Sequence, residues 1–275
     1  MFKRLSNGLL SPKETSVYYK EKFGKTILYL LILVLFMLIP VVISTSTSSL
    51  VSESGRKEIR KSFTNETIPF TIVNGTLENI NGDKSFVYKN QNLTGINFYI
   101  TEDIKNISTS LNNLNIVLGT DKVYLMVSSI AYPVIEYKEY EYLTNLNLSD
   151  SRTINSLTFW DNIFNIMDNE YNKARPTIIV FSTIIYFFYW AAWLAIFACV
   201  LSLFSKMRYG NVLKFSGLFK VSIYNLTPFV FCTIFGSLFG MQLLVYVGYV
   251  VSAVYSLIST SKILENMYNT RKEER

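Results

Sequence analysis

TILYLLILVLFMLIPVVI, at residues 26–43, is a run of eighteen residues without a charged side chain. At a rise of about 1.5 Å per residue, a helix of this length crosses a hydrocarbon core of about 30 Å. A cleaved signal peptide is the alternative, but its apolar core is usually about 7 to 15 residues long, and the following VVISTSTSS has no A-x-A cleavage site. We therefore expect a membrane-spanning helix over residues 26–44 that is retained as an anchor.

The composition of the whole chain points to the same class of protein. Half of the residues are hydrophobic, 15% are aromatic and the mean hydropathy is +0.26, values that are unusual for a soluble domain. The chain has no histidine, which excludes histidine-based catalytic triads and HExxH zinc sites. Its two cysteines, Cys199 and Cys232, lie in apolar runs and are expected to be small core residues. We expect no enzymatic activity, no cofactor and no metal site.

Two further apolar regions follow a long polar block. Residues 177–204 carry no acid or base and are long enough for one span, whereas the 41 uncharged residues of 221–261 are too many for a single crossing. Gly236 and Gly240 offer the turn of a hairpin of two helices. The expected fold is a membrane protein with four transmembrane α-helices and an α+β extracytoplasmic domain between helices 1 and 2. Its segments are a cytoplasmic stretch (1–25), helix 1 (26–44), the outer domain (45–176), helix 2 (177–204), a basic loop (205–220), helices 3 and 4 (221–261) and a tail (262–275).

The positions of Lys and Arg predict the orientation. Residues 1–25 hold six basic and two acidic residues. The 205–220 loop holds four basic residues and no acidic one, and the tail from Lys262 holds four basic and three acidic residues. The outer block holds twelve basic and fifteen acidic residues. Because short cytoplasmic segments carry the basic excess, both termini are expected in the cytoplasm. The net charge of +6 then reflects topology and anionic lipid rather than nucleic-acid binding.

The outer block is expected to be a folded domain. Short runs rich in β-branched and aromatic residues alternate with Asn-Gly and similar turns, as strands do. Two stretches, 54–63 and 153–174, have helical patterns, the second with Leu157, Trp160, Ile163, Phe164 and Met167 on one face. The expected strands lie at 68–73, 86–88, 96–101, 115–118, 122–129 and 132–140.

The N-terminal segment contains two local signals. Ser11-Pro12-Lys13-Glu14 has the pattern of a capping box, in which the Ser11 hydroxyl and the Glu14 carboxylate satisfy free N–H groups at the start of a helix. Residues 2–10 alternate apolar and basic side chains at near-helical spacing. They are either a short amphipathic piece in the headgroup layer or a plain basic flank.

Candidate site residues inside the spans are few, because no Asp, Glu, Lys or Arg occurs there. In the stretch around Asn225, Thr227 and Pro228, the proline frees a carbonyl that the neighbouring polar side chains can satisfy, or these side chains can bond another helix. A packed kink is the simpler interpretation, and the lining of a solute path is the alternative. Gly248, Ser252 and Ser256 form a small-residue stripe that allows close approach of a helix, from this chain or from a partner.

Two carboxylates mark a candidate ligand surface in the outer domain. If residues 132–140 and their continuation are a strand, alternation places Glu139 and Glu141 on one face, where they can share a cation or a sugar. A solvated strand edge is the simpler interpretation.

The pattern of motifs resembles a known family. LLSPK (9–13), GKTILYL (24–30) and SIYNLTPF (222–229), together with the external strand domain, are similar to the bacterial membrane family called domain of unknown function 1189. Some members carry the label maltodextrin utilisation protein (MalA). The resemblance covers nearly the whole chain and implies a bacterial cytoplasmic membrane and a link to carbohydrate uptake. It supplies no catalytic residues.

The function expected from the sequence is that of a non-enzymatic accessory or regulatory protein in the bilayer, with a membrane-protein partner such as a sugar transporter. A facilitator or channel for a small solute is the alternative. An ion-coupled carrier is disfavoured, because such carriers usually place an ionisable group at mid-membrane depth. An envelope enzyme using the outer carboxylates is the weakest hypothesis.

Overall fold

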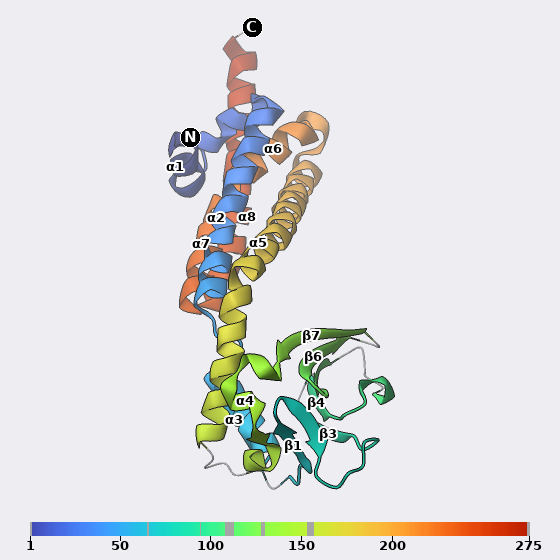
Figure 1. Ribbon diagram of the computed structural model, residues 1–275. Helices are drawn as coiled ribbons and strands as arrows, with labels where there is room; N and C mark the ends of the chain where they lie inside the picture. The colour runs from blue at the N-terminus through green and yellow to red at the C-terminus, as the bar shows by residue number, and fades with distance from the viewer. Residues whose placement is uncertain are drawn as a thin grey trace. The chain divides into compact units, whose positions relative to one another are not determined.

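The computed structural model describes residues 2–64, 66–93, 95–107, 113–127, 130–152 and 157–273. The chain forms two compact units (Figure 1). The helical unit consists of Met1–Thr47 and Arg175–Arg275, and the α/β unit consists of Ser48–Ala174. The boundary between Ala174 and Arg175 falls inside one long helix, α5 (Leu157–Tyr209).

Four stretches of the chain are long and apolar enough to cross a membrane, by length and composition. Together with a separate α/β region they fit a membrane protein, as the sequence predicts. The stretches are Phe23–Thr47, Thr158–Tyr209, Phe215–Phe239 and Gln242–Lys272. The helical unit comprises α1 (Phe2–Leu10), the 3-10 helix η1 (Glu14–Lys20), α2 (Phe23–Thr47), the C-terminal part of α5, η5 (Gly210–Val212), α6 (Phe215–Asn225), α7 (Thr227–Phe239) and α8 (Gln242–Glu273).

The stretch Phe215–Phe239 is not one regular helix. It is divided at Leu226 into α6 and α7, and Pro228 stands in the first turn of α7. Proline has no N–H to donate, so the helix ladder loses the bond that residue 228 would make to the carbonyl four residues earlier. The break is therefore a local consequence of the sequence.

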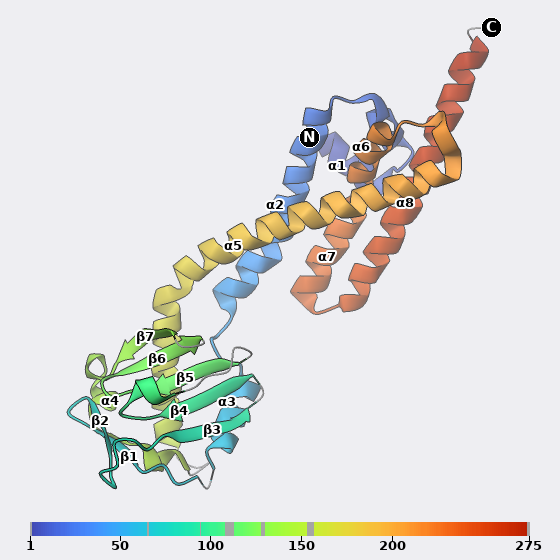
Figure 2. The same ribbon diagram turned by 90° about the vertical axis from the view of Figure 1, so that its right-hand side faces the viewer.

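A tight turn joins α7 to α8. Gly240 ends α7 in the left-handed region with φ 68°, where a residue without Cβ is favoured. The carbonyl of Gly236 accepts a hydrogen bond from the Met241 N–H at 2.8 Å. The two helices run back along each other from this turn (Figure 2).

The core of the helical unit is aromatic and aliphatic. Phe197, Phe229 and Tyr249 form a ring cluster in which Phe229 and Tyr249 have centroids 4.5 Å apart. Because these rings come from α5, α7 and α8, they tie three helices together. The fully buried members of this core include Tyr29, Leu33, Val34, Leu194, Ala198, Ile223, Tyr224, Leu226 and Val230.

The α/β unit contains two sheets. The larger has five strands in the order β3-β4-β5-β6-β7; β4 and β5 are parallel, and the other neighbours are antiparallel (Figure 2). Its strands are β3 (Tyr88–Leu93), β4 (Ile96–Ile100), β5 (Leu114–Leu118), β6 (Lys122–Val127) and β7 (Ile130–Glu136). The smaller sheet has the order β2-β1-β8, with β1 (Phe70–Val73), β2 (Thr76–Asn79) and β8 (Leu146–Asn147). The short helices are α3 (Glu53–Ser62), η2 (Ile104–Asn106), η3 (Tyr137–Glu139), α4 (Glu141–Thr144) and η4 (Leu148–Arg152).

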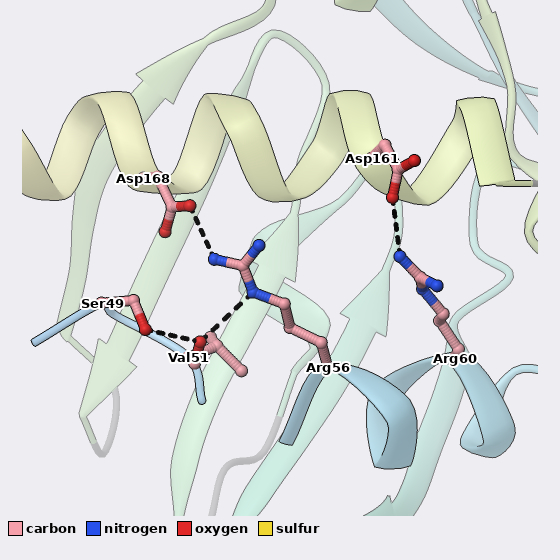
Figure 3. A network of polar contacts seen from close by, with 6 residues as sticks. All are labelled: Ser49, Val51, Arg56, Arg60, Asp161 and Asp168. Carbon is pink, nitrogen blue, oxygen red and sulfur yellow. Dashed lines mark hydrogen bonds and ion pairs between the residues drawn. The ribbon is translucent and has the colours of Figure 1, made fainter. Parts of the chain in front are cut away.

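Helix α3 is tied to the first part of α5. Arg56 Nη2 lies 2.6 Å from Asp168 Oδ2, and Arg60 Nη2 lies 2.7 Å from Asp161 Oδ1 (Figure 3). Both guanidinium groups also lie over the ring of Phe164, a cation–π arrangement. The predicted apolar face of this helix is confirmed in the described residues, since Trp160, Ile163, Phe164 and Met167 all belong to the core; the Leu157 side chain lies outside them.

The strand predicted at residues 132–140 is wrong at its end. The chain leaves β7 after Glu136 and turns into η3, with the Tyr140 N–H bonded to the Tyr137 carbonyl at 3.3 Å. The reason is Tyr137, whose side chain is buried and donates to the Gly119 carbonyl at 2.8 Å. Strand alternation therefore does not place Glu139 and Glu141 on one face.

Two more strand predictions need correction. Of residues 86–88, only Tyr88 belongs to β3, which continues to Leu93. The strand β2, directly after the Asn74-Gly75 turn, was missed because TLEN lacks the β-branched and aromatic pattern of a buried strand.

Candidate functional site

A buried polar cluster lies where the N-terminal segment meets the break between α6 and α7. Asn225 is fully buried; its Oδ1 accepts from the Thr15 hydroxyl at 2.9 Å and its Nδ2 donates to Ser259 Oγ at 3.0 Å. Ser259 Oγ also lies 2.7 Å from the Pro12 carbonyl oxygen. One amide thus joins the N-terminal segment to α6 and α8.

Thr227 satisfies the carbonyl that Pro228 leaves without its helical partner. That carbonyl belongs to Tyr224, and it accepts a hydrogen bond from the Thr227 hydroxyl at 2.6 Å. The Thr227 hydroxyl in turn lies 2.6 Å from the hydroxyl of Tyr29 on α2. Thr227 thus bonds the carbonyl at the break and links it to α2, while Asn225 bonds the N-terminal segment and α8.

Helix α1 lies directly against this break because residue 8 is glycine. A Cβ at Gly8 would lie 2.6 Å from the Tyr224 carbonyl oxygen and 3.1 Å from Thr227 Cβ, closer than side chains approach. Gly8 itself is buried. The contact therefore requires a residue without a side chain.

Three tyrosine rings lie in contact beside the cluster. The ring of Tyr224 has centroid distances of 4.1 Å to Tyr18 and 4.4 Å to Tyr29. Glu21 accepts a hydrogen bond from the Tyr224 hydroxyl and pairs with Arg4. Burial raises the pKa of Tyr18, against the opposing effect of a hydrogen bond from Asn7. The negative charge of Glu21 is thus balanced by Arg4 within the N-terminal segment.

The capping box predicted at Ser11–Glu14 is wrong. The Glu14 N–H bonds to the backbone carbonyl of Ser11 at 2.9 Å, and the following helix is a 3-10 helix without a side-chain cap. Thr15 provides the side-chain contacts instead, since its hydroxyl lies 2.8 Å from the Pro12 carbonyl oxygen as well as bonding Asn225.

The small-residue stripe of α8 packs within this chain. A Cβ at Gly248 would lie 2.9 Å from Phe229 Cα on α7, and Ser252 Oγ accepts from the Phe229 N–H at 3.2 Å. Ser256 Oγ lies 3.5 Å from Ser205 Oγ on α5. Of the two origins left open for the partner helix, the structure places this chain's own helices on the stripe.

The family model described as protein of unknown function (DUF1189) matches residues 2–260. The chain belongs to this family. The match includes both the N-terminal segment and the helix break that form the buried cluster. Neither the comparison with curated proteins nor that with solved structures gave a match.

The remaining predicted site residues of this DUF1189 protein are not brought to the cluster. Glu139 and Glu141 are exposed in the α/β unit, in η3 and at the start of α4. Among the described residues, no group of three or more His, Cys, Asp or Glu side chains is placed to hold a metal ion. Cys199 and Cys232 are free and half-buried.

Sequence reasoning missed several members of the buried cluster. Ser259 continues the stripe of Gly248, Ser252 and Ser256 by one more turn, so the same helical periodicity could have found it. Thr15 had no comparable signal, because its partner Asn225 lies 210 residues away in the sequence. The cluster is a tertiary feature of the DUF1189 chain rather than a local motif.

Proposed function

We propose that this protein is a non-enzymatic accessory or regulatory integral membrane protein of the bacterial cell envelope, whose helical unit associates with another membrane protein. The observation that carries the proposal is the outward face of α5. Ile185 and Phe188 on this face are 65% and 67% exposed. Tyr186 and Tyr189, whose rings carry hydroxyl groups, are exposed beside them. Hydroxyl groups on an apolar surface favour a protein partner over lipid tails, which offer no hydrogen bonds.

The proposal includes an orientation. Both termini and the 205–220 loop lie in the cytoplasm, and residues 45–176 lie outside, because the basic excess falls in the short segments. The bilayer covers the remaining apolar faces. Through the maltodextrin label carried by some members of the family, the partner is proposed to be a carbohydrate transporter, with the outer unit near its substrate.

The polar residues of the helix break favour this role over a solute path. Asn225, Thr227 and Pro228 are buried, and the two polar side chains are bonded to other groups of the chain. A path for a solute needs polar groups that can exchange partners. The polar groups of Asn225 and Thr227 are already hydrogen-bonded within the chain.

Photo-crosslinking tests the proposed association. p-Benzoylphenylalanine at Phe188 should form a covalent adduct with one membrane protein that also co-purifies stoichiometrically in mild detergent. The same probe at Leu35, an exposed residue of α2, is the matched control and should not capture that protein. Equal capture at both positions, or recovery of the chain alone, would refute the association.

A further inference from the structure

A cavity of about 350 Å³ opens beside the C-terminal half of α8, and its charged lining is mostly basic. Lys13, Arg208 and Lys262 line it together with one acid, Glu265. Lys262 Nζ lies 2.9 Å from Glu265 Oε1, so these two charges are matched. The excess of two positive charges comes from Lys13 and Arg208 and favours an anionic ligand.

The walls of the cavity are held together by hydrogen bonds. The hydroxyl of Tyr209, beside Arg208, lies 3.2 Å from Ser261 Oγ and ties the end of α5 to α8. The carbonyl of Pro12, beside Lys13, lies 2.7 Å from Ser259 Oγ. The two excess cations are therefore held at the cavity by two separate chain segments, each anchored on α8.

An exposed apolar stripe leads along α8 into the same cavity. Val250, Val254 and Leu257 are 63%, 45% and 38% exposed, and their spacing places them on one helix face that continues to Ser261. Leu257 also lines the cavity. The eleven residue-to-residue steps from Val250 to Ser261 rise by about 16 Å, roughly half of a hydrocarbon core of about 30 Å and so the depth of one leaflet.

We infer that this cavity binds the phosphate headgroup of an anionic phospholipid, with an acyl chain along Val250–Leu257. A guanidinium bonds two phosphate oxygens at once, and an ammonium adds a point charge, so Arg208 and Lys13 suit a phosphate diester. A zwitterionic headgroup carries a cation of its own, which Lys13 and Arg208 would repel, so an anionic headgroup is favoured. The inference rests on the proposed membrane location and is independent of any protein partner.

Native mass spectrometry of the purified full-length protein tests the site. The probes are phosphatidylglycerol and phosphatidylcholine with the same acyl chains, and glycerol phosphate as a soluble phosphate. We expect phosphatidylglycerol to bind at least about tenfold more tightly than the other two. Arg208→Gln should weaken its binding about tenfold, because a charge-assisted contact is lost. Lys206→Gln, which removes the same charge two residues away outside the cavity, should change binding by less than twofold.

Several results would overturn the inference. Equal losses in Arg208→Gln and Lys206→Gln would show that only the total charge matters. Glycerol phosphate binding as tightly as the lipid would make the site one for a free phosphate compound. If Arg208→Gln fails to fold, Lys13→Gln replaces it with the same expected loss. Because the isolated chain is measured, failure here is distinguishable from failure of the proposed association.

Discussion

The hydroxyl of Tyr29 lies 2.6 Å from the hydroxyl of Thr227, which links α2 to the point where Pro228 interrupts the third apolar stretch. Thr227 simultaneously donates to the carbonyl of Tyr224 at 2.6 Å. A single threonine therefore repairs the break and fixes a neighbouring helix against it. The two hydrogen bonds can be separated by mutation.

Thr227→Val is expected to destabilise the helical unit more than Tyr29→Phe. The valine keeps the shape but leaves both the Tyr224 carbonyl and the Tyr29 hydroxyl without a partner, at a cost of about 1–3 kcal/mol. Tyr29→Phe removes only one bond, which in membrane proteins averages about 0.6 kcal/mol. Midpoints of unfolding in mixed micelles provide the measurement, with Tyr246→Phe at an exposed position of α8 as the control.

The effects of substituting Tyr29 and Thr227 on the free energy of unfolding should be coupled. In a Thr227→Val background, Tyr29→Phe should cost less than in the wild type, because the hydroxyl it removes has already lost its partner. Additive losses would show that the two hydroxyls act independently and would contradict the assignment of this bond.

Gly8→Ala is expected to release α1 from the helix break. The added Cβ would lie 2.6 Å from the Tyr224 carbonyl oxygen, and the backbone there cannot move without disturbing the break. An overpacking cost of about 1–3 kcal/mol raises the undocked fraction at least about fivefold. The rate of tryptic cleavage after Arg4, which pairs with Glu21 in the docked state, measures this release.

Gly24→Ala is the matched control for this substitution. No atom lies within 4 Å of a Cβ at Gly24, and the residue is in the first turn of α2. Cleavage after Arg4 should be unchanged in Gly24→Ala. Equal cleavage in wild type and Gly8→Ala would mean that α1 does not depend on this close approach.

The proposed orientation predicts which cysteines an impermeant thiol reagent reaches in intact cells. After replacement of Cys199 and Cys232 by alanine, a cysteine at Ser85 in the α/β unit should react, and one at Ser216 in the first turn of α6 should react only after lysis. Both serines are exposed, so side-chain burial does not decide the result. Reaction of Ser216→Cys from outside with Ser85→Cys shielded would invert the topology.

The apolar helices could be predicted from the sequence because uncharged apolar runs of eighteen or more residues are typical of membrane-spanning helices and rare in soluble domains. The strands β4, β5 and β6 were also predicted, because their β-branched and aromatic runs carry a local signal. The same local signal wrongly predicts a strand at residues 137–139. Their alternation is that of a strand, yet the buried hydroxyl of Tyr137 finds its acceptor on Gly119, eighteen residues away, and the chain turns there.

The candidate site was predictable only in part. The role of Thr227 follows from the nearby Pro228, because the missing N–H leaves the Tyr224 carbonyl to be satisfied, whereas the partners of Asn225 come from the N-terminal segment and α8. The capping-box prediction is wrong because a hydrogen-bond partner from a distant part of the sequence competes with the local side-chain cap. Thr15, rather than Ser11, makes the side-chain contacts, and what fixes it is Asn225 at the other end of the chain.

Tyr137 is expected to make the α/β unit sensitive to alkaline pH. Burial raises the pKa of its hydroxyl well above the ordinary value, so the folded state keeps the proton that the unfolded chain releases near about pH 10. Stability from this group is therefore complete below about pH 10 and falls by about 1.4 kcal/mol per pH unit above it. Burial likewise raises the pKa of Tyr88, to about 12, which adds to the slope between about pH 10 and that value.

Tyr137→Phe should separate the two effects of this hydroxyl. At pH 8 it leaves the Gly119 carbonyl without its donor and lowers the free energy of unfolding by about 1–3 kcal/mol. Above about pH 10 the loss of stability should become shallower, because one ionisation is removed. Urea unfolding followed by the fluorescence of Trp160, with Trp190 and Trp193 replaced by phenylalanine, measures both. Tyr132→Phe, at a side chain that is 54% exposed, should leave the stability at pH 8 unchanged. An unaltered alkaline slope in Tyr137→Phe would show that another group controls unfolding there.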